Sequence, residues 1–137
     1  MTAKGSFEVE LAPLPLLQQA ADSKLGRMSI DKIFEGDLVG TSQGEMLSAM
    51  TDVKGSAGYV AIERLTGKLH GKSGSFVLQH SGTMSHGEQR LTITVVPDSA
   101  TGQLTGLSGS MSIRIEEGRH YYEFEYELAD DASNPKS

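Results

Sequence analysis

Apolar and polar side chains alternate residue by residue along much of this chain. Phe7, Val9 and Leu11, for example, alternate with Glu8 and Glu10. Successive side chains of a β-strand point to opposite faces, so this period-two pattern predicts strands with one buried and one solvated face. Apolar spacing typical of an amphipathic helix is nearly absent. The pattern therefore favours antiparallel β-structure, in which one face of a sheet can lie in water.

Glycine and proline residues divide the alternating segments into short strands. The 16 glycines and 4 prolines are scattered along the chain, as expected of turns between strands. We expect strands that include residues 6–12, 27–34, 45–53 and 57–69. Pro13 and Pro15 are expected to end the first strand. Residues 16–21 are the one segment that predicts a helical turn, and a bulge or bend is expected over residues 40–44.

Three two-residue loops predict hairpins in the second half of the chain, at residues 72–73, 86–87 and 117–118. Counting back from residues 72–73 places Leu65 opposite His80. It also puts His80 on the same face as the apolar residues of three neighbouring strands. That face carries Leu69, Phe76, Leu78, Leu91, Ile93 and Val95. The same count in the last hairpin places Met111, Ile113 and Ile115 opposite Phe124, Tyr122 and His120.

These elements predict an all-β domain, an antiparallel closed β-barrel of about eight strands, because closure removes exposed sheet edges that no helix here could cover. A two-sheet sandwich is the alternative. At 137 residues the chain, 1–137, is expected to form a single domain. Its ordered core should span about residues 5–130, with a frayed acidic tail over residues 130–137. The interior of such a barrel is either filled by side chains or wide enough for one small ligand.

Composition excludes several classes of function. The net charge of −6 argues against a nucleic-acid-binding surface, which depends on clustered lysine and arginine. No stretch approaches the roughly 20 apolar residues that cross a bilayer, and no apolar run near the N-terminus is typical of a signal peptide. The absence of cysteine excludes disulfides and thiolate metal sites. We therefore expect a cytoplasmic protein that binds neither nucleic acid nor membranes.

Three segments resemble a known family. They are residues 59–63 (YVAIE), residues 74–80 (GSFVLQH) with Gly82 and Met84, and the stretch from 97–99 (PDS) through Gly109. They resemble an uncharacterised bacterial family of small barrel proteins that is grouped by fold with allene oxide cyclase and dirigent proteins. The resemblance covers about residues 36–128. It implies an allene-oxide-cyclase-like barrel that forms homo-oligomers, and it implies no activity.

Glu63 and His80 are the best candidates for chemistry. His80 is predicted to lie diagonal to Glu63 on the apolar face, within reach of a long side chain. Tyr59 lies further along the strand that carries Glu63. A carboxylate and an imidazole so placed could act as general acid and base. The alternative is that they satisfy each other's hydrogen bonds at the edge of a packed core. The predicted ligand-binding residues are Tyr59, Glu63, Phe76, Leu78, His80, Ile93 and Tyr122.

No cofactor or metal is expected. The four histidines, His70, His80, His86 and His120, have spacings that match no metal motif. The acidic residues of the last strand are interpreted as its solvated face. Phosphate-loop and serine-hydrolase motifs are absent from the sequence.

Three functions remain open on this basis. The first is the binding of a small apolar or amphipathic molecule in the barrel, and the second is a cofactor-free isomerase or cyclase that uses Glu63 and His80. The third is a structural homo-oligomer with a filled barrel. Outward apolar residues such as Val60, Ile62 and Val77 favour a homodimer, with a trimer as the alternative.

Overall fold

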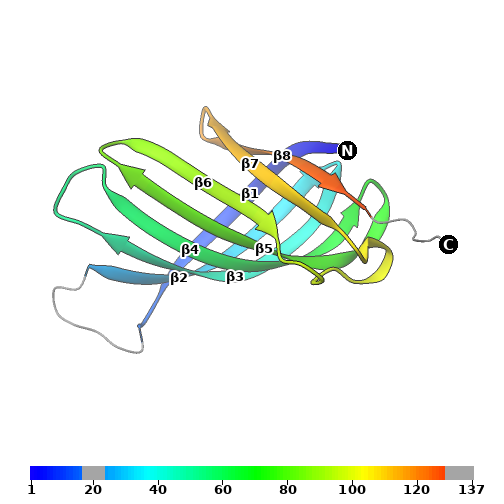
Figure 1. Cartoon of the computed structure of the whole chain (residues 1–137), viewed down its shortest axis with the longest axis horizontal. Coiled ribbons are helices and arrows are strands. Elements are labelled where there is room, and N and C mark those ends of the chain that lie inside the picture. The colour runs from blue at the N-terminus through cyan, green and yellow to red at the C-terminus, as the bar shows by residue number, and fades with distance from the viewer. Residues whose placement is uncertain (17–23, 129–137) are drawn as a thin grey trace.

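The computed structural model describes residues 1–16 and 24–128, and it shows a closed antiparallel barrel of eight strands in sequence order (Figure 1). The predicted barrel is therefore confirmed, and the sandwich alternative is excluded. The strands are β1 (Thr2–Leu14), β2 (Leu25–Gly36), β3 (Leu38–Met50), β4 (Ala57–Leu69), β5 (Lys72–Ser85), β6 (Glu88–Val95), β7 (Ser108–Glu116) and β8 (Arg119–Glu127). A 3-10 helix, η1 (Gly102–Leu104), lies between β6 and β7. No helix among the described residues is long and apolar enough to cross a membrane.

The first strand continues past the position where the sequence predicts its end. β1 pairs with β8 only from Thr2 to Phe7, whereas its pairing with β2 continues to Leu14. Pro13 therefore lies where β1 is an edge strand, a position that tolerates a missing N–H group. The helical turn predicted over residues 16–21 falls mostly outside the described residues, as does the tail predicted over residues 130–137.

Of the bulge or bend predicted over residues 40–44, the bulge is wrong. β3 pairs with β4 without a skipped residue from Leu38↔Leu69 to Met50↔Ala57. Gly40 and Gly44 serve close strand packing instead. A Cβ atom on Gly40 would lie 2.3 Å from the Thr66 carbonyl oxygen, and one on Gly44 would lie 2.1 Å from the Ile62 carbonyl oxygen. No side chain fits at either position, so glycine lets the sheet coil tightly there.

The predicted loop between β4 and β5 is also misplaced. The turn is formed by His70 and Gly71, with φ angles of 47° and 82°, so Leu69 pairs with Lys72. Two consecutive residues with positive φ make the type I′ turn that matches strand twist. Leu65 therefore pairs with Phe76 rather than with His80. Because the error is an even number of residues, every side chain stays on the predicted face.

The other two predicted hairpins are confirmed. His86 and Gly87 connect β5 to β6, and Glu117 and Gly118 connect β7 to β8, all with positive φ. The observed pairs include the predicted opposites in the last hairpin, namely Met111↔Phe124, Ile113↔Tyr122 and Ile115↔His120. The positions of the two-residue loops therefore determine which residues of β5 to β8 face the barrel interior.

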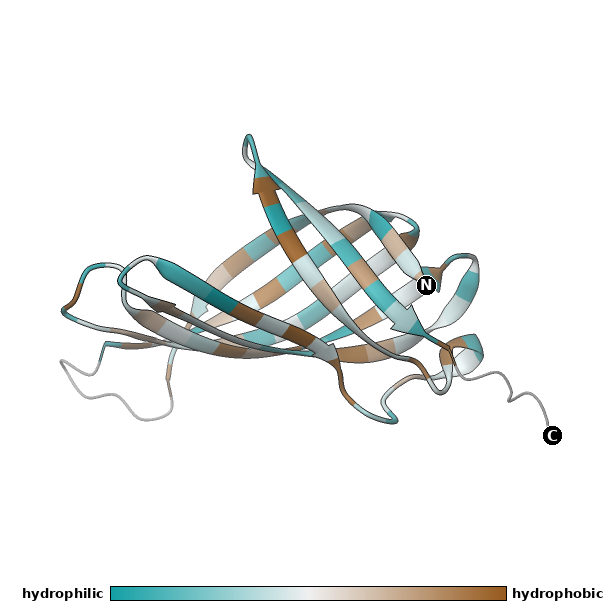
Figure 2. Cartoon of the chain, turned by 45° about the horizontal axis from the view of Figure 1, so that its top comes forward, coloured by the Kyte–Doolittle hydropathy of each residue, from teal (hydrophilic) through white to brown (hydrophobic). Residues whose placement is uncertain are grey.

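The barrel closes weakly between β6 and β7. Only two residue pairs join these strands, Ile93↔Met111 and Thr94↔Ser110. Beyond the Ile93↔Met111 pair, no further pair joins β6 to β7, and the β7–β8 hairpin stands away from the β5–β6 hairpin (Figure 2). We call the end of the barrel that contains the β5–β6 and β7–β8 turns the open end. The opposite end, which contains the β2–β3 and β4–β5 turns, is the packed end.

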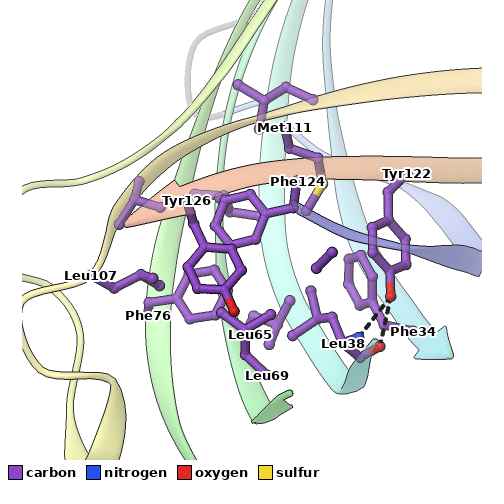
Figure 3. Close-up of a cluster of buried hydrophobic side chains, with 14 of the residues drawn as sticks. Phe34, Leu38, Leu65, Leu69, Phe76, Leu107, Met111, Tyr122, Phe124 and Tyr126 are labelled. Atoms are coloured by element: carbon purple, nitrogen blue, oxygen red, sulfur yellow. Dashed lines mark hydrogen bonds between the residues drawn. The ribbon is translucent and has the colours of Figure 1, made fainter. Parts of the chain in front are cut away.

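The packed end holds the hydrophobic core (Figure 3). The phenyl rings of Phe76 and Phe124 stack there with centroids 5.9 Å apart. Both are fully buried, as are Leu65 and Leu69. The remaining members include Phe34, Leu38, Leu78, Ile93, Leu104, Leu107, Met111, Tyr122 and Tyr126. At this end, inward-facing side chains fill the barrel.

The hydroxyl group of Tyr122 joins β8 to the β2–β3 turn. It accepts a hydrogen bond from the Leu38 N–H group at 2.8 Å. The carbonyl oxygens of Glu35 and Leu38 lie 2.9 and 3.0 Å from it as acceptors. A Cβ atom on Gly5 would lie 2.6 Å from this hydroxyl oxygen. A glycine on β1 therefore makes room for a buried hydrogen-bonded junction.

We predict that Tyr122→Phe lowers the free energy of unfolding by about 1–3 kcal/mol, because it leaves the buried Leu38 N–H group without a partner. Urea unfolding would measure this loss. The matched control is Tyr121→Phe on the outer face of the same strand, which should change stability little. Equal stability of the two variants would contradict the assigned role of Tyr122.

Candidate functional site

Four polar side chains meet inside the barrel between its packed and open ends. Lys32 comes from β2, Ser42 from β3, Glu63 from β4 and His80 from β5. All four are buried, and Glu63 is 0% exposed. They come together because each occupies an inward position in the alternation of its strand, on four consecutive strands of the barrel. We call these residues the buried cluster.

The Glu63 carboxylate is the centre of the buried cluster. Its Oε1 atom accepts a hydrogen bond from Ser42 Oγ at 2.6 Å. Its Oε2 atom lies 2.9 Å from Lys32 Nζ and is hydrogen-bonded to His80 Nε2. His80 pairs directly with Ala61 and lies diagonal to Glu63, so the predicted diagonal contact exists although the predicted register was wrong.

The ammonium group of Lys32 is held between the carboxylate and two aromatic rings. Its Nζ atom lies 4.9 Å from the ring centroid of Phe7 and 5.9 Å from that of Phe34. A cation over the face of a desolvated aromatic ring gains electrostatic stabilisation. The positive charge of Lys32 therefore neutralises the negative charge of Glu63 although both groups are removed from water.

Burial alone would raise the pKa of Glu63. The hydrogen bond from His80, the positive charge of Lys32 and the hydrogen bond from Ser42 outweigh this effect and lower the pKa to about 2. Glu63 is therefore an ionised acceptor at neutral pH. Because a carboxylate can only accept, His80 must donate its Nε2 proton to it.

The second ring nitrogen of His80 faces Tyr59. The Tyr59 hydroxyl oxygen lies 3.4 Å from His80 Nδ1, a long separation for a hydrogen bond. Gly82 positions the Tyr59 ring, because a Cβ atom there would lie 2.6 Å from Tyr59 Cε1. Burial, and then the negative charge of Glu63, raise the pKa of Tyr59, so its hydroxyl stays protonated at neutral pH.

Beyond the buried cluster, inward-facing apolar side chains are exposed to solvent. Leu11, Leu91 and Ile115 point into the barrel at the open end, yet they are 49%, 44% and 63% exposed. Three inward methionines on β2, β3 and β5 are only partly buried, namely Met28, Met46 and Met84. Inward-facing apolar side chains at the open end are therefore accessible to solvent next to the buried cluster.

The structure brings some predicted site residues together and separates others. Tyr59, Glu63 and His80 contact one another where the packed end of the barrel meets the open end. The remaining predicted residues, Phe76, Leu78, Ile93 and Tyr122, are buried members of the hydrophobic core.

Sequence reasoning missed Lys32 and Ser42. Lys32 stands between Ile30 and Phe34 at an inward position of β2, where the alternation predicts an apolar residue. That mismatch was the available signal. Ser42 gave no such signal in the sequence, because a serine fits either face of a strand.

The other histidines do not join the buried cluster. His70 is hydrogen-bonded to Tyr126 and lies 3.6 Å from Asp37, and the His120 ring lies 5.2 Å from that of Phe7. Within residues 1–16 and 24–128, no group of three or more histidine or carboxylate side chains is placed to hold a metal ion.

Large apolar side chains lie next to one another on the outer face of β3 and β4. Leu47 pairs with Val60, and Ile62 lies two residues further along β4 on the same face. Each is about half exposed. Val60 and Ile62 therefore point outward as predicted, and the homodimer expected from them stays a prediction.

We predict that Glu63→Gln destabilises the protein at pH 7 by about 3–5 kcal/mol, because it leaves the buried Lys32 ammonium without its counter-ion. The lowered pKa of Glu63 stabilises the fold fully above the ordinary glutamate pKa of about 4.3, and this contribution is lost as the pH falls toward 2. The difference from the parent protein should therefore shrink between pH 4.5 and 2.5 in urea unfolding.

Two control variants test this prediction. The exposed carboxylate variant Glu8→Gln should show no such pH-dependent difference. Lys32→Met combined with Glu63→Gln should be more stable than Glu63→Gln alone, because no unpaired charge remains buried. A stability difference between Glu63→Gln and the parent that stays constant with pH would contradict an ionised Glu63.

Comparison with known proteins places the chain in a family. The family model described as "Protein of unknown function (DUF3224)" matches residues 3–126. A crystal structure of a protein with unknown function from the DUF3224 family of Shewanella oneidensis MR-1 is similar, with a TM-score of 0.90 and 54% sequence identity. The similarity covers 94% of this chain and 97% of that one. No curated protein matches. The chain therefore belongs to the DUF3224 family.

Proposed function

We propose that this DUF3224 barrel binds a small amphipathic molecule at its open end. The apolar part would lie among the inward side chains there, and the polar end would reach Tyr59 and His80. The observation that best supports this proposal is that inward-facing apolar residues are exposed at this end, whereas Leu65 and Leu69 at the packed end are 0% and 1% exposed. A ligand would remove this apolar surface from water, at about 25 cal/mol per Å².

The dimensions of the open end fit a small molecule. His80 and Met84 are four residues apart on β5, which corresponds to about 13 Å along a strand. The partly buried methionines supply flexible side chains that adapt to an irregular apolar ligand. Together, an apolar lining and a few convergent polar groups are the usual features of a ligand site.

We predict that the neutral apolar dye N-phenyl-1-naphthylamine binds the purified protein and becomes more fluorescent. In the protein labelled at its methionine methyl groups, NMR signals of Met28, Met46 and Met84 should shift on binding. Met111 lies in the packed core and is the internal control, so its signal should stay in place.

Shifts confined to Met111 would place the dye in the packed end and contradict this proposal. Absence of binding would contradict it as well, and would favour a structural role for the barrel. Native mass spectrometry of protein purified from its own host, followed by extraction, would identify the natural ligand.

Proton transfer on the bound molecule is a second candidate function. Tyr59, His80 and Glu63 form a chain in which the carboxylate orients the imidazole and leaves Nδ1 toward Tyr59. A carboxylate that fixes the tautomer of a histidine is a recurring arrangement for general bases. In a bound ketone, Nδ1 would take a proton from the α-carbon. The C–H electrons would form an enolate, whose oxygen the Tyr59 hydroxyl would stabilise.

We predict that the protein accelerates exchange of the α-hydrogens of 2-decanone for deuterium in D₂O, measured by NMR. His80→Gln should abolish the acceleration while keeping a side chain that can bond to Glu63. An exchange rate equal to that without protein would exclude this second function and leave the binding proposal intact.

A further inference from the structure

The charges of the buried cluster are balanced within it. Both Glu63 oxygens have donors, and Lys32 is occupied by Glu63 and by the faces of two rings. Both charges therefore already have their partners within the cluster.

Among the described contacts, the Tyr59 hydroxyl and His80 Nδ1 have only each other as hydrogen-bond partners. In the neutral imidazole, Nδ1 is an acceptor because Nε2 carries the proton given to Glu63. The Tyr59 hydroxyl is a donor, and its 3.4 Å separation from Nδ1 is too long for a strong hydrogen bond. The pair thus offers one donor and one acceptor side by side, and they satisfy each other poorly.

A hydroxyl group complements this pair. Its O–H would donate to His80 Nδ1, and its oxygen would accept the proton of Tyr59. An ether oxygen could accept but could not donate. A carboxylate or an ammonium would need desolvation beside a cluster whose own charges are already paired, which is costly.

We infer that the ligand head is an uncharged hydroxyl group that bridges Tyr59 and His80, so that the open end takes medium-chain alcohols and similar hydroxylated amphipathic compounds. This inference rests on the proposed binding function and adds the chemical class of the ligand.

Binding of four probes with the same decyl chain, measured by displacement of the dye at pH 8, tests the inference. The probes are 1-decanol, decyl methyl ether, decanoate and decylamine. We expect 1-decanol to bind about tenfold more tightly than each of the others, since one or two hydrogen bonds separate them. Tyr59→Phe should weaken 1-decanol and the ether alike, by about fivefold, because the oxygen of either probe can accept the Tyr59 proton.

The matched control is Tyr121→Phe, which removes a hydroxyl from the outer face and should alter no affinity. Equal affinities for 1-decanol and the ether would overturn the inferred head group while leaving the binding function in place. Tightest binding by decanoate or decylamine would overturn it in favour of a charged ligand. Failure of the dye and all four probes to bind would overturn the proposed function, and this inference with it.

Discussion

A fully buried carboxylate can persist in a protein only when hydrogen bonds and an opposite charge replace the water it has lost. Glu63 meets this condition through Lys32, Ser42 and His80, which come from three other strands. The cluster can form only if β2, β3, β4 and β5 keep their register, because a slip of one residue would turn its members outward. The ion cluster and the barrel architecture therefore depend on each other.

The buried cluster also separates two different halves of the barrel. On one side, stacked rings and leucines fill the interior, and the Tyr122 hydroxyl ties β8 to the turn between β2 and β3. On the other side, β6 and β7 share only two residue pairs. The packed end supplies most of the apolar burial. Apolar surface at the open end can therefore stay exposed, because most of the burial that stabilises the fold is at the packed end.

Period-two alternation, the spacing of the turns and the lack of a covering helix together predicted the eight-stranded barrel, and counting from the two-residue loops predicted the inward faces of the later strands. The loop placed at residues 72–73 rather than at His70 and Gly71 was an error of four residues in pairing. Because four is even, His80 stayed inward, and it stayed diagonal to Glu63 because its predicted partner Leu65 and its observed partner Ala61 each lie two residues from Glu63. The predicted bulge failed because Gly40 and Gly44 serve close packing between strands, which a single sequence does not distinguish from a bulge.

The weak closure could not be predicted at all. Which strands pair at the seam of a barrel depends on shear and tilt over the whole sheet, and no local pattern specifies these. Lys32 was predictable in principle, as a charged residue at an apolar position of an alternating strand. It was missed because lysines on strands are usually solvated or protect edges.

Stability alone does not explain the buried cluster. Replacing a buried ion pair with apolar side chains of similar volume is often neutral or stabilising, so a contribution to stability is not enough to account for this pair. The packed end is filled with apolar side chains. Four strands nevertheless converge on an ionised Glu63 at the point where the packing stops, with His80 and Tyr59 on its open side. The cluster fixes the orientation of the His80 imidazole beside the solvent-exposed apolar side chains of the open end, a role that core packing does not require.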